Sequence, residues 1–453
     1  MRTLISLLLG VVFWQVLAGT AAAQTNDEVF PQFQWNFSTP GARANAMGRA
    51  FIGLADDATA AITNPAGLTA LTRPQVYVEL KSNDLKVNRL AVRDSLFSAQ
   101  TSPFGGTINS VPFFAASMPL LNGRVAVGVS RSEFLNYQES FSLTSRTIPD
   151  SLCTSPISRS CRQMFPETGS TDFRGSSLGA SVAVNVNKMV KVGFTVARDM
   201  LDAKTRATRF EVARPDIVLD EASIDSSSSG TSATVGVLFK PTDKISAGIT
   251  YTKAPTFQLQ ELYQFNVGDC EFFTCPGGVP SNQPLRNYTS AAFINGIGVE
   301  INVPDRIGLG VSARPTPRLT VAFDAVRINY SKLAKNFTII FGRESLTSSN
   351  FAINDVTEIH AGGEYTLFDS LKGLNAPVLV RAGVFTNPAH RVQFIPGSNS
   401  ATNDFQSAVF NTGTAETQVK GTIGAGLVFS RRVQMDLAYV WKQDVVLSAA
   451  YRF

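Results

Sequence analysis

The chain has two histidines, His360 and His390, so a catalytic Ser-His-Asp arrangement would have to use one of them. His390 falls in a stretch with loop character, where we expect a solvated ring. His360 alternates with Glu358 and Glu364, which places a Glu-His-Glu ladder on one face of a strand. Such a ladder could relay protons, but ordinary polar lining is the more common role. With no Gly-rich phosphate loop and no HExxH helix, the sequence predicts no catalytic residue and no enzyme.

Asp56 and Asp57 offer a second chemical option, because neighbouring carboxylates can ligate a metal ion. No further carboxylate or histidine clusters beside them in the sequence, so we predict no metal site and no cofactor. We instead expect Asp57 to cap a short helix over 58–62, and one of the two carboxylates to pair with Arg43 or Arg49. An earlier helical stretch is expected over 43–54.

The four cysteines form two close pairs, Cys153 with Cys161 and Cys270 with Cys275. An even count at short spacing favours local disulfides in an exported chain. Unpaired thiols are the alternative. A zinc site is disfavoured, because there is no C-x2-C spacing and both histidines are far away in the sequence.

The elements that would position these residues begin with an export signal. Residues 1–23 have a positive residue at Arg2, an apolar core over 4–17 and a small-residue site at 21–23, which is the pattern of a secretory signal peptide. No run of about 18 apolar residues follows, so no membrane-spanning helix is expected. The net charge of +5 is not gathered into a basic stripe, which argues against a nucleic-acid partner.

From Gln75 onward, apolar residues recur at every second position. The clearest runs are Val433-Met435-Leu437-Tyr439-Trp441, Val445-Leu447-Ala449-Tyr451-Phe453, Ile307-Leu309-Val311-Ala313 and Ile245-Ala247-Ile249-Tyr251. The intervening positions are small or polar, as at Gly308, Gly310, Thr422 and Gly424. One apolar face and one wet face is the pattern of strands in a membrane barrel.

The predicted connections alternate between short and long. Short turns are expected near 120–123, 187–189, 240–243, 314–317, 368–375 and 430–432, and long polar links near 83–110, 142–171, 213–229, 266–301, 336–353 and 388–415. The serine run over 225–230 is expected to be a flexible loop tip. The pattern predicts an all-β transmembrane antiparallel barrel of about 14 strands, with short periplasmic turns and both termini in the periplasm.

Three blocks before the first strand carry a family resemblance: Ala-Met-Gly-Arg-Ala, Ala-Asp-Asp-Ala and Asn-Pro-Ala-Gly-Leu, all within 46–68. In that order they resemble the N-terminal hatch of the FadL/TodX family of outer-membrane long-chain fatty acid and hydrocarbon transporters. The resemblance implies a signal peptide over 1–23, a hatch with short helices over 24–74 and a barrel over 75–453. The hatch-motif residues are Met47, Gly48, Asp56, Asp57, Asn64, Pro65, Ala66 and Gly67.

The resemblance also implies a function, namely passive outer-membrane transport of hydrophobic compounds, with long-chain fatty acids favoured. Phe51, Ile52 and Leu54 would offer an apolar surface to the ligand, and Lys191, Arg381 and Lys420 are the candidate lumenal cations for a carboxylate head. The expected partners are the hydrophobic small molecule, outer-membrane lipid and lipopolysaccharide. The C-terminal Phe453 is expected to be read by the barrel-assembly machinery.

Three rival interpretations remain open at the level of sequence. A structural or secretion-accessory barrel could share the hatch and transport nothing. A lipid-modifying barrel enzyme would need His360 beside a serine. A soluble secreted β-sandwich could have the same composition, although it gives no reason for loop lengths to alternate so regularly.

Overall fold

The computed structural model describes residues 35–94, 98–143, 146–148, 162–164, 167–210, 218–265, 286–287, 297–335, 339–341, 344–346, 348–368, 377–390, 392–397, 417–429 and 432–453. The expected signal peptide and all four cysteines lie outside these residues, so both expectations stay predictions. None of the described helices is long and apolar enough to cross a membrane.

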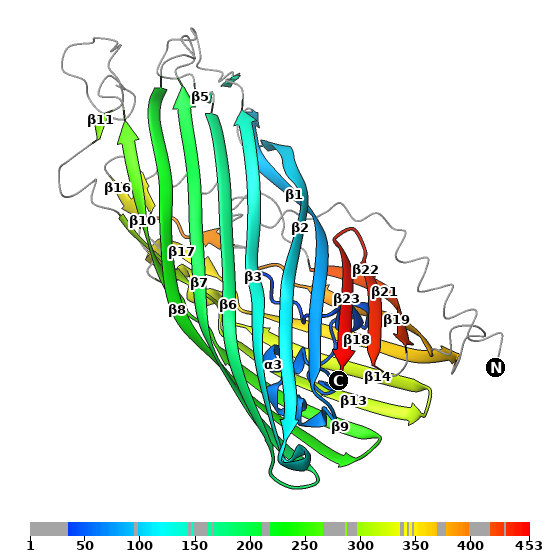
Figure 1. Cartoon of the computed structure of the whole chain (residues 1–453). Helices are drawn as coiled ribbons and strands as arrows, with labels where there is room; N and C mark the ends of the chain where they lie inside the picture. Colours follow the sequence, from blue (N-terminus) through cyan, green and yellow to red (C-terminus); the bar gives the residue numbers. More distant parts are fainter. Residues whose placement is uncertain are drawn as a thin grey trace, which may run out of the picture.

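The chain folds into a closed antiparallel barrel of fourteen strands, as predicted (Figure 1). Each wall strand pairs with its sequence neighbours, and β1 pairs with β23 from Gln75–Arg452 to Asn83–Asp444, which closes the wall. The wall strands are β1 (Gln75–Asp94), β2 (Ser98–Leu120), β3 (Val125–Leu143), β6 (Glu167–Asn185), β7 (Val190–Phe210), β8 (Val218–Thr242), β9 (Ile245–Lys253), β13 (Arg306–Thr316), β14 (Leu319–Ile328), β18 (Val356–Phe368), β19 (Val378–Asn387), β21 (Gln418–Phe429), β22 (Val433–Val440) and β23 (Asp444–Arg452).

Shorter strands lie toward the long-loop end of the barrel. β10 extends the wall by pairing with β8, β11 and β12, and the other short strands pair among themselves. Their bounds are β4 (Arg146–Ile148), β5 (Arg162–Met164), β10 (Thr256–Phe265), β11 (Arg286–Asn287), β12 (Ile297–Asn302), β15 (Ile339–Phe341), β16 (Glu344–Leu346), β17 (Phe351–Ile353) and β20 (Val392–Phe394), with 3-10 turns η4 (Leu121–Gly123), η5 (Tyr330–Ala334) and η6 (Ser348–Asn350).

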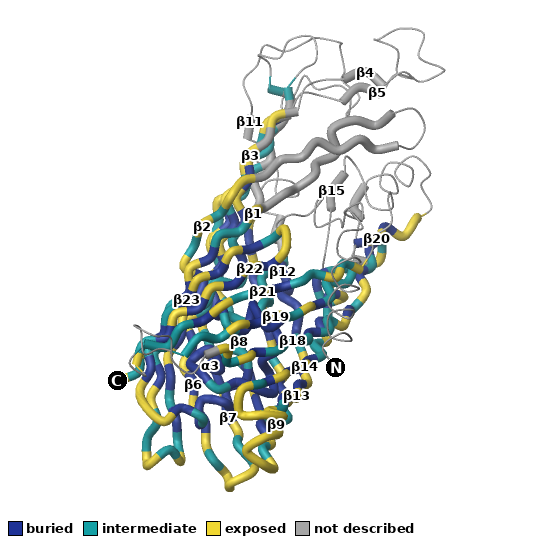
Figure 2. Tube along the Cα trace, turned by 90° about the vertical axis from the view of Figure 1, so that its right-hand side faces the viewer, coloured by how far each residue is buried: buried dark blue, intermediate teal, exposed yellow. Residues whose placement is uncertain are grey.

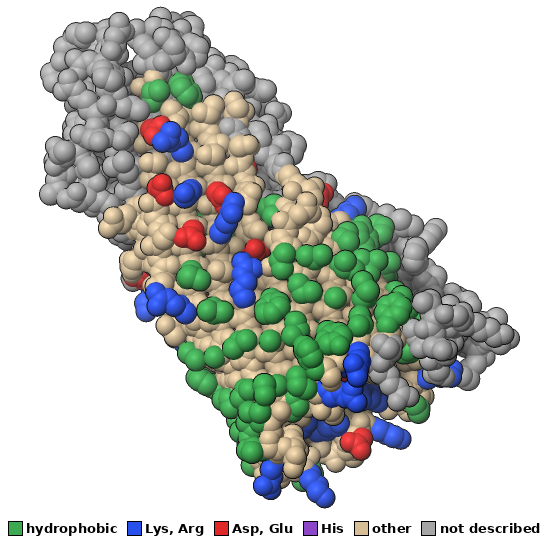
Figure 3. Space-filling model, viewed as in Figure 1, with side chains coloured by type: hydrophobic (Ala, Val, Ile, Leu, Met, Phe, Trp, Pro, Cys, Tyr) green, Lys and Arg blue, Asp and Glu red, His purple; other side chains and the backbone are tan. Residues whose placement is uncertain are grey.

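The predicted alternation decides which face each residue takes. Buried and exposed positions alternate along the wall strands (Figure 2). Outward positions such as Val311, Met435 and Leu447 are exposed apolar side chains, whereas their neighbours Ser312, Gln434 and Ser448 are buried. Apolar side chains gather in a broad belt on the outer surface (Figure 3). Because lipid offers no hydrogen bonds, a closed ladder with an apolar outer face is the form in which strands can cross a membrane.

The wall is much taller on one side than on the other. The strands β1–β3 and β6–β8 have 19 to 25 residues, whereas β21–β23 have 8 to 12. Since about 9–11 residues span a bilayer, the tall strands project well beyond it. Much of the sequence that was predicted to form long loops, at 83–110 and 213–229, therefore belongs to strands β1, β2 and β8. The serine run was predicted wrongly as a loop tip, because Asp225–Gly230 lies within β8 and pairs with β7.

The hatch is the segment that precedes β1 and lies inside the barrel. Its elements are α2 (Ala42–Ala46), α3 (Ala60–Thr63) and η3 (Pro65–Ala70), so both predicted helices are shorter than expected. Gly48 and Arg49 have φ of 63° and 68°, which ends the first helix early. Asp57 does not cap directly: its carboxylate accepts the Thr59 N–H at 2.9 Å, and the helix starts after this turn.

Candidate functional site

Glycines on the inner face of the wall let the hatch backbone lie directly against the strands. A β-carbon at Gly362 would lie 2.2 Å from the Met47 carbonyl oxygen, and one at Gly383 would lie 2.2 Å from the Gly48 nitrogen. Gly193 on β7 is equally close to the Ala66 nitrogen. A larger residue at these inward positions would collide with the hatch backbone. Close packing of the hatch therefore explains why glycines recur on the inner face of the strands.

Asp324 of the wall and Asn64 of the hatch are among the buried polar side chains that connect the hatch to the wall. The fully buried Asp324 carboxylate on β14 accepts the backbone N–H groups of Phe51 and Ile52 at 2.6 and 2.8 Å. Asn64 donates to the carbonyls of Ile52 at 3.0 Å and Val237 at 3.3 Å. Its backbone is extended, with φ −153° and ψ 95°, as expected before proline. The Asn-Pro block therefore joins two parts of the hatch and fixes both to β8.

A chain of opposite charges runs under the hatch. Arg43 pairs with Asp56 at 2.5 Å and with Glu364 at 2.8 Å, which confirms the predicted ion pair for the Asp-Asp block. Glu364 also pairs with Arg381 at 2.7 Å, and Arg381 reaches Asp436 at 2.8 Å. The candidate cation Arg381 is thus matched by two wall carboxylates.

Asp57 lies beside this chain, with its carboxylate 3.8 Å from Arg43. Burial raises the pKa of Asp57 to about 6; Arg43 lowers it, and Asp56 raises it further. Among the described residues, no group of three His, Cys, Asp or Glu side chains is placed to hold a metal ion. Asp56 of this block joins Arg43 of the hatch to Arg314 of β13 through ion pairs.

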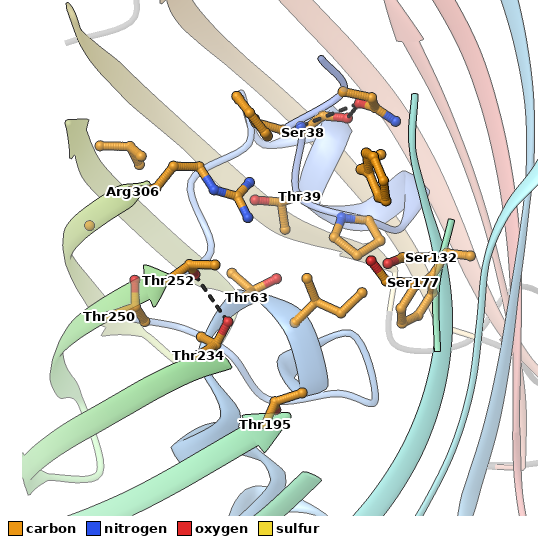
Figure 4. A pocket seen from close by; sticks show the side chains of 18 of the residues that line it. Ser38, Thr39, Thr63, Ser132, Ser177, Thr195, Thr234, Thr250, Thr252 and Arg306 are labelled. Atoms are coloured by element: carbon orange, nitrogen blue, oxygen red, sulfur yellow. Dashed lines mark hydrogen bonds between the residues drawn. The ribbon is translucent and has the colours of Figure 1, made fainter. Parts of the chain in front are cut away.

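A cavity of about 150 Å³ lies between the hatch and the tall side of the wall (Figure 4). Hydroxyl groups from β3 and β6–β9 line it, and Thr234 and Thr252 hydrogen-bond to each other across neighbouring strands at 3.0 Å. On the hatch side the lining includes Ile52 and Thr63. The hydroxyl lining is Ser130, Ser132, Ser177, Thr195, Ser232, Thr234, Thr250 and Thr252.

Arg306, the first residue of β13, reaches into the same cavity (Figure 4). Its guanidinium carbon lies 4.4 Å from the centre of the Phe37 ring, and among the described residues it forms no ion pair. Three lining carboxylates already accept hydrogen bonds, namely Asp324 from the hatch, Glu79 from the Gly41 N–H and Glu358 from His360. Sequence reasoning missed Arg306, although it shares the wet face with Gly308 and Gly310.

An apolar cluster fills the interior next to this cavity, toward the long-loop end. Phe134 stacks on Phe257 at a ring-centroid distance of 5.9 Å, and Trp35 and Phe37 from the start of the hatch pack against the same group. The buried members are Leu135, Tyr137, Phe173, Leu201, Ala203, Ala254, Phe257, Leu259, Ile301, Val303, Ile328, Tyr330, Leu333, Phe351, Ile353, Val356, Val392 and Phe394. A more open hollow of about 660 Å³ lies beyond it, between β2, β3 and β6–β8.

The wall is interrupted beside the cavity, between β2 and β3. The described pairing between β2 and β3 runs from Leu120–Val125 to Phe113–Ser132 and stops there (Figure 1). Beyond this point β2 remains paired with β1, and β3 remains paired with β6. Polar groups released at this point find other partners. Arg131 donates to the Val111 carbonyl at 2.6 Å, and the Asn36 N–H donates to the Phe134 carbonyl at 2.8 Å. The cavity lining includes Phe113, Ser132 and Phe134, so it reaches this gap.

The remaining candidates occupy different places. Ile52 lines the cavity, whereas Phe51 and Leu54 are buried in the hatch core with Met47. Lys191 lies near the short turn between β6 and β7, and Lys420 donates to the Gln443 side chain at 3.0 Å near the opposite end.

The histidines differ from each other. His360 faces inward as predicted, 3.1 Å from Glu358. His390 is not simply solvated, because it stacks on Tyr330 at a centroid distance of 4.1 Å.

Comparison with known proteins gives one family match. A family described as outer membrane protein transport protein (OMPP1/FadL/TodX) matches residues 33–389. No curated protein sequence is similar enough to match the chain.

Solved structures similar to the fold include a Pseudomonas aeruginosa FadL homologue, with TM-score 0.63, 12% identity and coverage of 92% of this chain and 99% of that one. The Ralstonia pickettii toluene transporter TbuX has TM-score 0.57 and 14% identity, and the P. putida toluene transporter TodX has 0.55 and 13%. Both cover 92% of this chain and 99% of their own. At these identities the likeness shows the shared fold.

Proposed function

The chain belongs to the outer membrane protein transport family (OMPP1/FadL/TodX), and from that premise we propose that it passively carries long-chain fatty acids across the outer membrane. The observation that supports an acid rather than a hydrocarbon is Arg306, a guanidinium that faces the lumenal cavity without an ion pair among the described residues. The family implies that the transported compound is hydrophobic. The proposal that this compound carries a carboxylate head group rests on Arg306 of this chain.

Arg306 is suited to hold a carboxylate. A guanidinium presents its donors as a fork that matches both oxygens of a carboxylate, and such charge-assisted pairs are about twice as strong as neutral hydrogen bonds. Taking an unpaired charge out of water is costly, so a ligand carboxylate beside the Arg306 guanidinium would offset the cost of burying that charge. The hydroxyl groups of Thr250 and Thr252 on β9 lie on the same cavity wall and offer further donors.

The apolar cluster supplies the second half of the site. An acyl chain gains about 0.8 kcal/mol for each methylene that leaves water, and the buried side chains around Phe134 and Phe257 form an apolar region beside the cavity. In this arrangement the head would lie at Arg306 and the chain along the cluster. Ile52 of the hatch would close the cavity from below.

The gap between β2 and β3 is the exit that we propose. It opens from the cavity where the outer surface is still apolar, since Val111, Phe114 and Val129 are exposed beside it. A hydrophobic compound leaving there would enter lipid and would not cross water. The roles of Phe51, Leu54, Lys191, Arg381 and Lys420 in ligand binding, contacts with outer-membrane lipid or lipopolysaccharide, and recognition of Phe453 by the assembly machinery stay predictions.

Uptake of labelled oleate and labelled toluene by cells that lack their own transporter tests the proposal. The variants are Arg306→Gln and, as a matched control, Arg327→Gln, whose side chain is exposed on the outer face of β14. We expect Arg306→Gln to lower oleate uptake about tenfold or more while toluene uptake and the control stay at the wild-type level, at equal amounts in the membrane.

Toluene uptake without oleate uptake by the wild type would replace the fatty-acid proposal with a hydrocarbon one. Uptake of neither compound by a well-assembled barrel would favour the accessory-barrel interpretation. Equal oleate uptake by Arg306→Gln and wild type would remove Arg306 from the site.

A further inference from the structure

The hydroxyl groups that line the cavity form rows across the inner face of the wall. In one row Thr252 on β9 is the register partner of Arg306, and Thr234 on β8 is the partner of Thr252. The same row continues through Thr195 on β7 to Ser181 on β6. A polar track therefore leads from Arg306 across five adjacent strands toward β3.

The hydroxyl groups of this row are already engaged. Thr234 and Thr252 share one hydrogen bond, and Thr195 and Ser181 share another at 2.8 Å. Thr195 also donates to the Ala61 carbonyl of the hatch at 2.7 Å. The row therefore holds wall strands and hatch together, and its hydroxyl groups find their partners within the protein.

Ser130 and Ser132 on β3 differ from that row. Both line the cavity, and in the described part of the chain neither side chain forms a hydrogen bond. Ser177 on β6, the register partner of Ser132, lies beside it (Figure 4) but donates to Asp199. Ser132 is also the partner of Phe113 in the last β2–β3 pair. Two uncommitted hydroxyl groups thus lie where the cavity meets the gap in the wall.

The charges around the cavity determine which polar group suits each end. Arg306 lies at the β13 end, whereas Glu133 of β3 lines the cavity next to Ser132. A ligand carboxylate is attracted to Arg306 and repelled by Glu133. A neutral hydroxyl group suits the β3 end, because it can both donate to and accept from a serine.

A plain acyl chain fits the β3 end poorly. It would take the hydroxyl groups of Ser130 and Ser132 out of water without giving them a hydrogen-bond partner, and that costs affinity. A hydroxyl group on the chain would replace the lost water. For this reason a site that hydrogen-bonds a substrate hydroxyl discriminates against the analogue that lacks it.

The register also places the two serines far from the carboxylate end. β3 lies five strand steps from β13, which is about 24 Å along the wall at about 4.8 Å per step. A ligand hydroxyl next to the carboxylate would instead meet Thr250 and Thr252 on β9, beside Arg306. Only a hydroxyl group well along the chain reaches Ser130 and Ser132.

We propose that the ligand is a fatty acid with a hydroxyl group in the middle of its chain. Its carboxylate binds Arg306, and its hydroxyl group binds Ser130 and Ser132 beside the gap between β2 and β3. This inference rests on the proposed fatty-acid function and narrows its substrate class.

Uptake of three labelled acids by cells that lack their own transporter tests the inference. The acids are oleate, ricinoleate (oleate with one mid-chain hydroxyl group) and an oleate with its hydroxyl group on the carbon next to the carboxylate. The test variant is Ser130→Ala with Ser132→Ala. The matched control is Ser227→Ala with Ser229→Ala, which removes two exposed hydroxyl groups from the outer face of β8. Initial rates are compared between variants for each acid, at equal amounts of barrel in the membrane.

We expect the Ser130→Ala, Ser132→Ala variant to take up ricinoleate about tenfold more slowly than wild type. Its uptake of oleate and of the acid hydroxylated next to the carboxylate should stay at the wild-type level, because neither places a hydroxyl group at β3. The control should match wild type for all three acids.

Two results would overturn the inference and leave fatty-acid transport standing. Unchanged ricinoleate uptake by the test variant would show that the mid-chain hydroxyl group is not bound at β3. An equal loss for oleate and ricinoleate would show that the two serines support the wall and do not select the ligand. A well-assembled wild type that moves none of the three acids would overturn the proposed function, and the inference with it.

Discussion

Replacing Gly383 by alanine tests whether wall glycines hold the hatch in place. The added β-carbon would lie 2.2 Å from the Gly48 nitrogen and 2.4 Å from the Met47 carbonyl carbon, whereas ordinary contacts begin near 3.4 Å. The nearest atoms are backbone, so no side chain can swing aside and the hatch must withdraw by roughly 1 Å. Overpacking of this kind costs about 1–3 kcal/mol, which is about 5- to 150-fold in the equilibrium for local opening.

Amide hydrogen exchange of hatch peptides in the purified barrel measures that equilibrium directly. Gly421→Ala is the matched control, because Gly421 pairs with Val384 on the adjacent strand and nothing lies within 4 Å of its added carbon. We expect faster exchange around Met47 and Gly48 in Gly383→Ala and wild-type exchange in Gly421→Ala. A folded Gly383→Ala barrel with unchanged hatch protection would refute the packing argument.

Three further outcomes are expected. Burial raises the pKa of Asp57 from 3.8 to about 6, so the protonated carboxyl group favours the docked hatch. This contribution to hatch stability, on the order of 3 kcal/mol, is fully present below about pH 3.8 and is lost as the pH rises through 6. Asp57→Asn should remove this pH dependence from the hydrogen-exchange protection factors of the hatch, and an unchanged dependence would assign it to other carboxylates. Asn64→Ala removes three side-chain hydrogen bonds, to the Ile52 and Val237 carbonyls and from the Ala66 N–H, and should weaken hatch docking by about 1–3 kcal/mol. The measurement is the frequency of leak events in single-channel recordings, which should rise, with a silent channel as the contrary result. If the two cysteine pairs are disulfides, alkylation before reduction will label none of the four thiols.

Sequence reasoning succeeded where the signal is local. Alternation along residues such as Met435, Leu437 and Tyr439 identified outward faces, because successive side chains in a strand point to opposite sides whatever the partner is. The short turns after β2, β6, β8 and β13 were predicted for the same reason, since turn residues and loss of the two-residue period mark them; the turn predicted at 368–375 lies almost wholly outside the described residues. The heights of β1, β2 and β8 were missed, because polar alternation above the membrane resembles a loop until the neighbouring strand is known.

The site divided in the same way. The hatch blocks and the pairing of Arg43 with Asp56 were anticipated from residues close in sequence. The cation that is available to a ligand was not anticipated. The alternation of the strands places both Arg381 and Arg306 on the inner face, and it does not tell which of them is already paired. Glu364 and Asp436, which match the charge of Arg381, come from neighbouring strands.

The sequence by itself determined that this chain is a hatch-containing β-barrel, since residue alternation, turn spacing and the hatch blocks are properties of short stretches. Only the tertiary structure decided that Arg306 faces the cavity without an ion pair among the described residues and that the β2–β3 ladder stops beside it. These features depend on which strands become neighbours, and charges far apart in the chain act together only once the barrel has closed.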